Sequence, residues 1–365
     1  MIVTRRQFLT KAAAVIGTLT AGPAWGASPQ PTPGGLTTVE QELRQLIAAR
    51  ALAREDAWVL MHVVVALGAE VRYGSEPVID FVARRWIEPV AKGGNTFPAF
   101  PAKVEAHPNH FLAVLYEVGV APTRTFSTTM GKITRADLTR GAKALFSPAI
   151  DPSELSWTVS VLTADVRPGA DRFDAADGRS FTVNAIVEGL AQVTEAGFAD
   201  TFAAMRGTKP YGRSNLQKFP CNGAHALGGL MDAVRNGYQG NRLTERVRTL
   251  VGASVFRLHA EVRLMQQVLG AAEGPLARLN LDAAKLQFIG HSLENLAFAE
   301  RHAIYRPTAA DQAIITAAER ELIGVVHRIV AEHDLDLLAR EVPRAYGVLL
   351  GDACHALAAL RSRVA

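Results

Sequence analysis

Apolar residues recur at steps of three and four through most of the chain, which is the spacing of one face of an α-helix. Clear examples lie within residues 60–67, 112–116, 227–234 and 293–297. The alternating pattern of a half-buried strand is scarce, and Gly and Pro separate the helical runs. The pattern therefore predicts a mainly α fold.

A large ring-bearing residue marks the start of each successive helical run. These marker residues are Trp58 with His62, then His110, Trp157, His225, His291 and His355. From His62 onward they are 48, 47, 68, 66 and 64 residues apart. Each interval is long enough for an inner helix, a return helix and their loops, so the chain reads as six helical hairpins.

Repeated helical hairpins bury their apolar faces only by stacking on neighbours or by closing into a ring. Six hairpins can close into an α/α toroid with its inner helices around one cavity, and an open α-solenoid is the alternative. The markers are chemically active side chains and not one apolar residue repeated for packing. This favours the closed ring, in which each marker can have its own role in one shared cavity. We expect residues 39–365 to form this single domain, with the markers facing a shared cavity.

The N-terminus has the order of a twin-arginine export signal. Arg5 and Arg6 precede a short apolar run at residues 12–19, and small residues follow at 24–27. That run is about half of the roughly 20 apolar residues needed to span a bilayer. Residues 1–27 are therefore expected to direct the folded protein through the twin-arginine translocase into the periplasm, with a flexible Pro/Gly tether at 28–38.

Charge and cysteine content exclude two classes of protein. Removing the signal takes away Arg5, Arg6 and Lys11, so the formal charge falls from +4 to +1 (4 − 3 = 1). The mature chain has no concentrated basic run, so we expect no nucleic-acid partner. Two cysteines, Cys221 and Cys354, are too few for a disulfide-rich scaffold, and the sequence leaves open whether they pair.

Two short motifs concentrate the candidate chemistry. In the first, Cys221 and His225 are four residues apart, which places them on the same face if they share a helix. In the second, His291 and Glu294 are three apart and also adjacent on a helix. A glycine precedes each histidine, at Gly223 and Gly290, and we expect it to allow a tight turn at the helix start.

The helix that starts near His225, together with Gly290-His291-Ser292-Leu293-Glu294, resembles the N-acylglucosamine 2-epimerase family and its α/α-toroid relatives. The resemblance covers these two motifs and the count of six hairpins. It implies a pair of cavity histidines that exchange a proton at the carbon next to a sugar carbonyl, as in epimerases and isomerases. Cys221 has no counterpart in that family.

The chemistry of the side chains supports the same interpretation. Imidazole titrates near neutral pH, so His225 and His291 are candidates for general base and general acid, with Glu294 orienting one of them. Trp58 and Trp157 are expected to stack on a sugar ring. Further ligand contacts are predicted from His62, His110, Asn222 and Arg213, the last in the loop 206–220.

A metal site is the alternative use of the same residues. Cys221, His225 and His291 offer one thiolate and two imidazoles, which suit zinc or copper. The sequence thus leaves two functions open. One is a periplasmic toroid that handles a carbohydrate-like ligand by histidine acid/base chemistry, and the other is a metal-binding or accessory subunit that docks onto an exported protein.

Overall fold

The fold is mainly helical, as the sequence predicts. The computed structural model describes residues 33–212 and 214–364, and helices make up most of them. The predicted signal at 1–27 and Arg213 lie outside the described residues. No helix within the described ranges combines the length and the apolar content needed to cross a bilayer.

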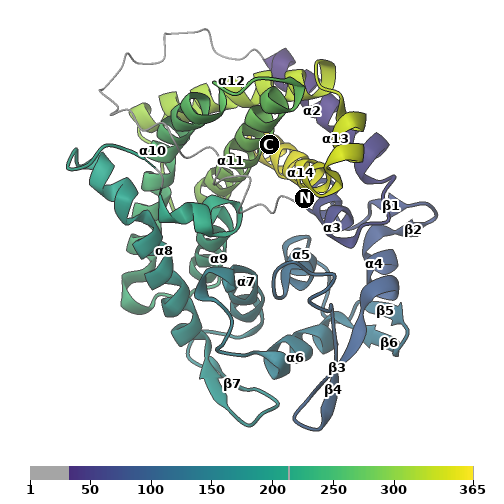
Figure 1. The fold of residues 1–365 in the computed structure, drawn as a ribbon. Helices are drawn as coiled ribbons and strands as arrows, with labels where there is room; N and C mark the ends of the chain where they lie inside the picture. The colour runs from purple at the N-terminus through teal and green to yellow at the C-terminus, as the bar shows by residue number, and fades with distance from the viewer. Residues whose placement is uncertain (1–32, 213, 365) are drawn as a thin grey trace.

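Six helices surround the centre of the molecule (Figure 1). In chain order they are α3 (Ala57–Leu67), α5 (His110–Glu117), α7 (Ser156–Asp165), α9 (Ala224–Arg235), α11 (Pro275–Arg301) and α14 (Pro343–Val364). Each packs against the next, and α14 packs in turn against α3. The six inner helices are therefore a closed cycle of neighbours.

Six further helices lie outside this cycle, each against at least one inner helix. They are α4 (Val78–Trp86), α6 (Arg135–Leu145), α8 (Val183–Met205), α10 (Leu243–Leu269), α12 (Ala309–Ala331) and α2 (Pro33–Leu46). The chain passes around the molecule in order, and α2 packs against both α12 and α14 (Figure 1). The first and last helices of the described residues are thus neighbours.

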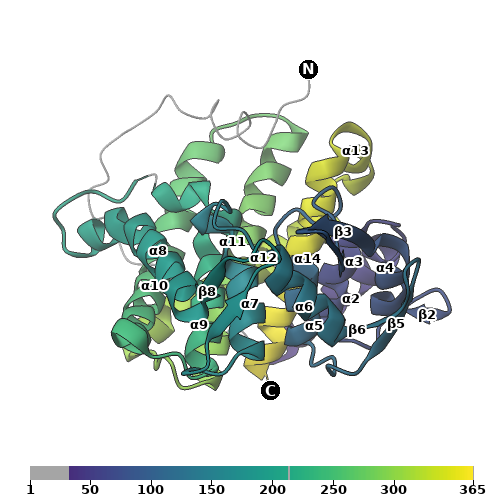
Figure 2. The same ribbon diagram turned by 90° about the horizontal axis from the view of Figure 1, so that it is seen from below.

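Shorter helical segments join or extend these helices. The helix α13 (Leu335–Glu341) lies at the start of α14, which runs from there to the C-terminus in Figure 2. One π-helical turn, η1 (Ile47–Ala51), follows α2. The 3-10 turns are η2 (Pro152–Glu154), η3 (Asn215–Lys218), η4 (Pro220–Gly223) and η5 (Gly240–Arg242).

The strands form four separate two-stranded antiparallel hairpins between helices. They are β1 (Arg72–Tyr73) with β2 (Glu76–Pro77), β3 (Glu88–Lys92) with β4 (Asn95–Ala99), β5 (Thr125–Thr128) with β6 (Gly131–Thr134), and β7 (Arg172–Asp174) with β8 (Ser180–Thr182). In β5–β6, Thr128 pairs with Gly131, so only two residues form the turn. These hairpins are too short to give an alternating signal in the sequence.

Two sequence predictions about helix starts are wrong. Residues 33–38 of the expected tether belong to α2, because Pro33 fits the first turn of a helix, where its missing N–H is not needed. His291 lies in the middle of α11, which starts at Pro275. Gly290 therefore makes no turn; a Cβ there would lie 3.2 Å from the backbone nitrogen of Ala356, so the glycine allows α11 and α14 to pack closely.

The contact between α7 and α9 gives a stability prediction. A Cβ at Gly229 of α9 would lie 2.6 Å from the carbonyl oxygen of Ser156, and this backbone cannot move aside as a flexible side chain can. We expect Gly229→Ala to lower the free energy of unfolding by about 1–3 kcal/mol, the usual cost of overpacking. Urea denaturation measures this change.

Gly189 of α8 is the matched control. Nothing lies within 4 Å of a Cβ there, so Gly189→Ala should raise the free energy of unfolding by about 0.5–1 kcal/mol through helix propensity. A Gly229→Ala variant as stable as Gly189→Ala would contradict the close approach of α7 and α9.

Candidate functional site

One ring-bearing side chain from each inner helix meets the others at the centre of the molecule. We call these the central cluster: His62, His110, Trp157, His225, His291 and His355. In that order, successive ring centroids are 5.0, 5.3, 4.7, 4.9 and 3.9 Å apart, and His355 lies 5.1 Å from His62. The six rings thus form a closed circle of contacts, which is the convergence expected from their spacing.

The backbone before α9 forms a left-handed turn that the sequence did not reveal. Cys221 has φ 46°, Asn222 has φ 56° and Gly223 has φ 84°, and α9 starts only at Ala224. Cys221 and His225 therefore do not share one helix, as the four-residue spacing had suggested. The left-handed conformation costs about 1–2 kcal/mol for a residue with a side chain, and such strain gathers at functional sites.

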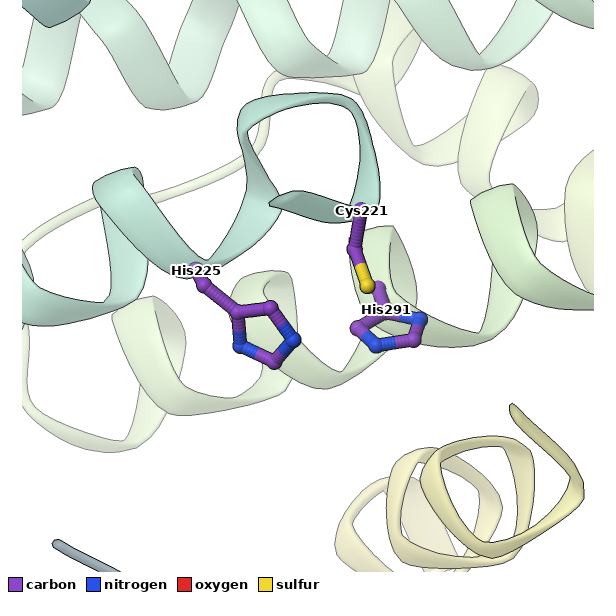
Figure 3. Close-up of side chains that lie close together, drawn as sticks. All are labelled: Cys221, His225 and His291. Atoms are coloured by element: carbon purple, nitrogen blue, oxygen red, sulfur yellow. The ribbon is translucent and has the colours of Figure 1, made fainter. Parts of the chain in front are cut away.

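The turn brings the thiol of Cys221 toward two histidines. The ligand atoms of Cys221, His225 and His291 all lie within 4.8 Å of one another, and Figure 3 shows the sulfur beside the His291 ring. Zinc bonds of about 2.0–2.3 Å put tetrahedral ligands roughly 3.5 Å apart, so small side-chain rotations would close the set around an ion. One thiolate and two imidazoles fit zinc or copper.

Backbone carbonyls fix the tautomers of two cluster histidines. Nδ1 of His291 lies 2.8 Å from the carbonyl oxygen of Gln287, and Nδ1 of His62 lies 2.6 Å from that of Trp58. A carbonyl only accepts, so each Nδ1 carries the hydrogen and donates it. The lone pair of the neutral ring is then on Nε2, which is the arrangement of metal-binding histidines whose other nitrogen is held by a hydrogen bond.

The partner of Glu294 differs from the prediction. Its carboxylate accepts a hydrogen bond from Nδ1 of His355 over 2.7 Å, whereas the sequence assigned it to His225 or His291. The two residues are 61 apart in the chain, so helix spacing did not reveal the pair. Burial disfavours the charged imidazole of His355, but Glu294, Asp352 and Glu117 outweigh it and raise the pKa of His355 above its ordinary value.

The pKa values of three other histidines of the cluster are lowered. Burial, together with neighbouring histidines, lowers the pKa of His62 to about 3 and the pKa values of His110 and His225 well below the ordinary value. The rings of neutral His225 and of His355 lie 5.4 Å apart. Neighbouring groups whose pKa values are pushed apart are suited to act as base and acid.

A buried carboxylate positions the start of α5. Glu105 is buried and accepts hydrogen bonds from the backbone nitrogens of Asn109, at 3.0 Å, and Phe111, at 2.6 Å. Burial raises the pKa of Glu105 to about 8 despite these two donors. This capping holds His110, the first residue of α5, in the central cluster.

A cavity of about 130 Å³ lies against the central cluster. His110, Trp157, His225 and His355 line one part of it, and further polar residues line the rest, among them Glu117, Asp232, Arg235 and Glu294. The sequence predictions did not include Glu117 and Asp232. Each lies seven residues after a marker histidine, which is two helical turns along the same face, so this spacing was a usable signal.

The other predicted ligand residues, Trp58, Trp157 and Asn222, already contact other protein groups. Trp58 packs on His62 with ring centroids 3.9 Å apart, and the ring of His107 stacks on Trp157 at 4.3 Å. One face of Trp157 is therefore already covered, which limits the predicted stacking on a sugar. Asn222 lies in the left-handed turn, where its carbonyl accepts a hydrogen bond from Arg257 over 3.0 Å.

Cys221 and Cys354 do not form a disulfide with each other. Comparisons with protein-family profiles, with curated proteins and with solved structures give no match. The resemblance to the epimerase family therefore stays a prediction.

The Glu294–His355 pair predicts a measurable titration. We expect Glu294→Gln to lower the pKa of His355, because the carboxylate that favours the charged ring is lost. Side-chain NMR of metal-free protein measures this value, with Glu341→Gln on the exposed surface as control. An unchanged pKa of His355 in Glu294→Gln would contradict the pairing.

The same pair predicts how stability depends on pH. The pKa of His355 in the folded protein is raised above its ordinary value of 6.5, so the pair stabilises the fold fully below that value and loses this effect as the pH rises through the folded-state pKa. The stability difference between wild type and Glu294→Gln should therefore be larger at about pH 6 than at about pH 9. Urea denaturation at both pH values measures it.

Proposed function

We propose that the protein is an α/α toroid of six helical hairpins whose centre binds a zinc or copper ion and works as a reaction centre. The observation that carries this proposal is the grouping of Cys221, His225 and His291, whose ligand atoms lie within 4.8 Å of one another. Their chemistry, one thiolate and two imidazoles, matches the ligands that these two metals prefer.

The toroid is supported by how the helices pair. Inner helices α3, α5, α7, α9 and α11 each pack against the outer helix that follows them, and α14 packs against α2 from the start of the chain. An open solenoid keeps its terminal repeats apart, whereas here α14 contacts both α2 and α3. The closed arrangement also explains why six distant residues meet in one cluster.

Three protein ligands favour a reaction centre over a closed structural site. Structural zinc sites usually have four protein ligands, while catalytic sites have three and leave one position for water or substrate. His225 belongs both to the ligand set and to the wall of the cavity, so that position would be next to the cavity. A bound metal would supply Lewis-acid chemistry there.

The place of action is part of the proposal. The export signal predicted at residues 1–27 implies that the protein works in the periplasm. A cysteine outside the cytoplasm tends to be oxidised or to pair, and coordination by a metal would hold the Cys221 thiolate in one state. An accessory subunit of an exported complex would bind the same metal but would not need a fourth coordination position open to substrate.

Acid/base chemistry on a carbohydrate-like ligand is the second candidate function, and the Glu294–His355 pair favours it. In this version neutral His225 is the general base and His355, held by Glu294 over 2.7 Å, is the general acid. The predicted resemblance to the epimerase family is in line with such an isomerase. His355 takes the role that the sequence had suggested for His291.

Metal content tests the proposal, and the chain offers a matched control because it has only two cysteines. Protein purified after native export should contain about one zinc or copper ion per chain. Cys221→Ala removes a ligand and should reduce the content about tenfold or more. Cys354→Ala, which changes a buried cysteine outside the ligand set, should leave it unchanged.

Elemental analysis of the three proteins identifies the metal at the same time. Wild type without a bound metal, in both the purified and the zinc-reconstituted or copper-reconstituted forms, would contradict the metal proposal and leave acid/base chemistry as the function. Equal metal content in wild type and Cys221→Ala would show that the ion binds elsewhere.

A further inference from the structure

A buried arginine from another helix holds the strained turn that carries Cys221. Nη1 of Arg257, in α10, donates a hydrogen bond to the carbonyl oxygen of Asn222 over 3.0 Å. The two residues are 35 apart in the chain, and Arg257 is only 3% exposed. Asn222 lies before the first residue of α9, so the bond fixes backbone that belongs to no α-helix. Its donor is charged, which makes it stronger than a bond between neutral groups.

The rest of the guanidinium group of Arg257 is also held in place. Its central carbon lies 5.5 Å from the ring centroid of Phe198 in α8 and 5.1 Å from that of Phe288 in α11. Nη2 lies 3.8 Å from Oε2 of Glu261, which is buried one turn further along α10. The charge of Arg257 is thus balanced inside the protein, and the two rings keep the side chain in one place.

Glu261 holds the chain that leads to the turn. Its carboxylate accepts hydrogen bonds from the hydroxyl of Tyr211 and, over 3.4 Å, from Nε2 of Gln217. Arg257 and Glu261 are four residues apart and lie on one face of α10. The two side chains together hold the segment before α9 at Tyr211, at Gln217 and at Asn222, the residue next to Cys221.

The turn needs support of this kind because its backbone is unfavourable. Cys221 and Asn222 have φ values of 46° and 56°, and residues with a side chain keep the left-handed conformation only where surrounding contacts compensate for it. If the turn relaxed to the right-handed region, the side chain of Cys221 would point in another direction. The grouping of the three ligand atoms within 4.8 Å therefore depends on the turn.

We infer that Arg257 is a positioning residue for the metal centre. Its hydrogen bond to Asn222 holds the left-handed turn that directs the thiol of Cys221 toward the two histidine ligands. Arg257 belongs neither to the ligand set nor to the wall of the cavity, so it acts only through the backbone of the turn. The inference deepens the proposed function and rests on it in treating Cys221, His225 and His291 as metal ligands.

Cobalt(II) tests this inference because it occupies zinc sites and shows a charge-transfer absorption band when a thiolate binds it. Arg257→Met keeps an apolar side chain of similar length between the two rings but donates no hydrogen bond. Titration of the mature protein should show cobalt affinity lowered about tenfold or more in this variant, the effect of one lost charge-assisted hydrogen bond. The band should also be weaker at saturating cobalt. A purely structural role of Arg257 would lower stability and leave the band unchanged.

A rescue variant and a control make the test specific for the turn. Glycine adopts positive φ readily, so Asn222→Gly added to Arg257→Met should restore the band and most of the affinity. Arg246 is on the same helix but forms its ion pairs with Glu188 and Glu195 of α8, at 2.7 and 2.6 Å. Arg246→Met should therefore bind cobalt as wild type does. No rescue by Asn222→Gly, or equal loss in Arg246→Met, would contradict the inference.

A second variant is needed because Arg257→Met leaves the buried carboxylate of Glu261 without its opposite charge, which can prevent folding. Arg257→Met combined with Glu261→Gln removes both charges and keeps an oxygen that accepts from Tyr211. This variant lacks only the support at Asn222, and it should lose the cobalt band as Arg257→Met does. A full band in the folded double variant would show that Arg257 does not position the thiol.

Thiol alkylation of metal-free protein separates this inference from the metal proposal. In a Cys354→Ala background, Cys221 is the only cysteine and is half-buried. Arg257→Met should raise its rate of alkylation by iodoacetamide about tenfold or more, because the released turn exposes the thiol. A raised rate in protein that binds no cobalt even as wild type would refute the metal proposal and leave Arg257 as the residue that holds the turn. An unchanged rate would show that Arg257 does not hold it.

Discussion

The close approach of the inner helices is the constraint on which the rest of the structure depends. Gly229 of α9 leaves room for the backbone of α7, and Gly290 of α11 leaves room for the backbone of α14. Gly351 of α14 does the same for the ring of Trp58, since a Cβ there would lie 2.5 Å from it. These close approaches accompany the ring contacts between α7 and α9, α11 and α14, and α3 and α14. Glycine packing thus contributes to how the central cluster is assembled.

Bringing several imidazoles together away from water has an electrostatic consequence. A charged imidazole is disfavoured by burial and by its neighbours, so His62, His110 and His225 are held neutral with lowered pKa values. Among the cluster histidines with a shifted pKa, His355 alone has a raised value, because it is hydrogen-bonded to the carboxylate of Glu294. A neutral imidazole can bind a metal ion as a ligand or accept a proton as a base. The strained turn at Cys221 places a thiol beside these imidazoles.

Much of the fold was predictable from periodicity, and so was the meeting of the six markers, because one residue per inner helix recurs at hairpin spacing. Other features depend on contacts between distant segments. Glu294 bonds to His355, which is 61 residues away, and no local pattern encodes that distance. The left-handed turn at Cys221 and Asn222 was hidden because neither residue adopts positive φ as readily as a glycine does. Glu117 did have a local signal, because it lies seven residues after His110 and so on the same face of a helix.

The central claim is that the thiol of Cys221 and the imidazoles of His225 and His291 hold one metal ion among the six inner helices. Anomalous diffraction from crystals of the exported protein, recorded above and below the zinc and copper absorption edges, tests it most directly. We predict a single anomalous peak at one of these edges, about 2.0–2.3 Å from all three ligand atoms. Crystals of metal-supplemented protein with no peak there, or with the peak bound to other side chains, would contradict the account.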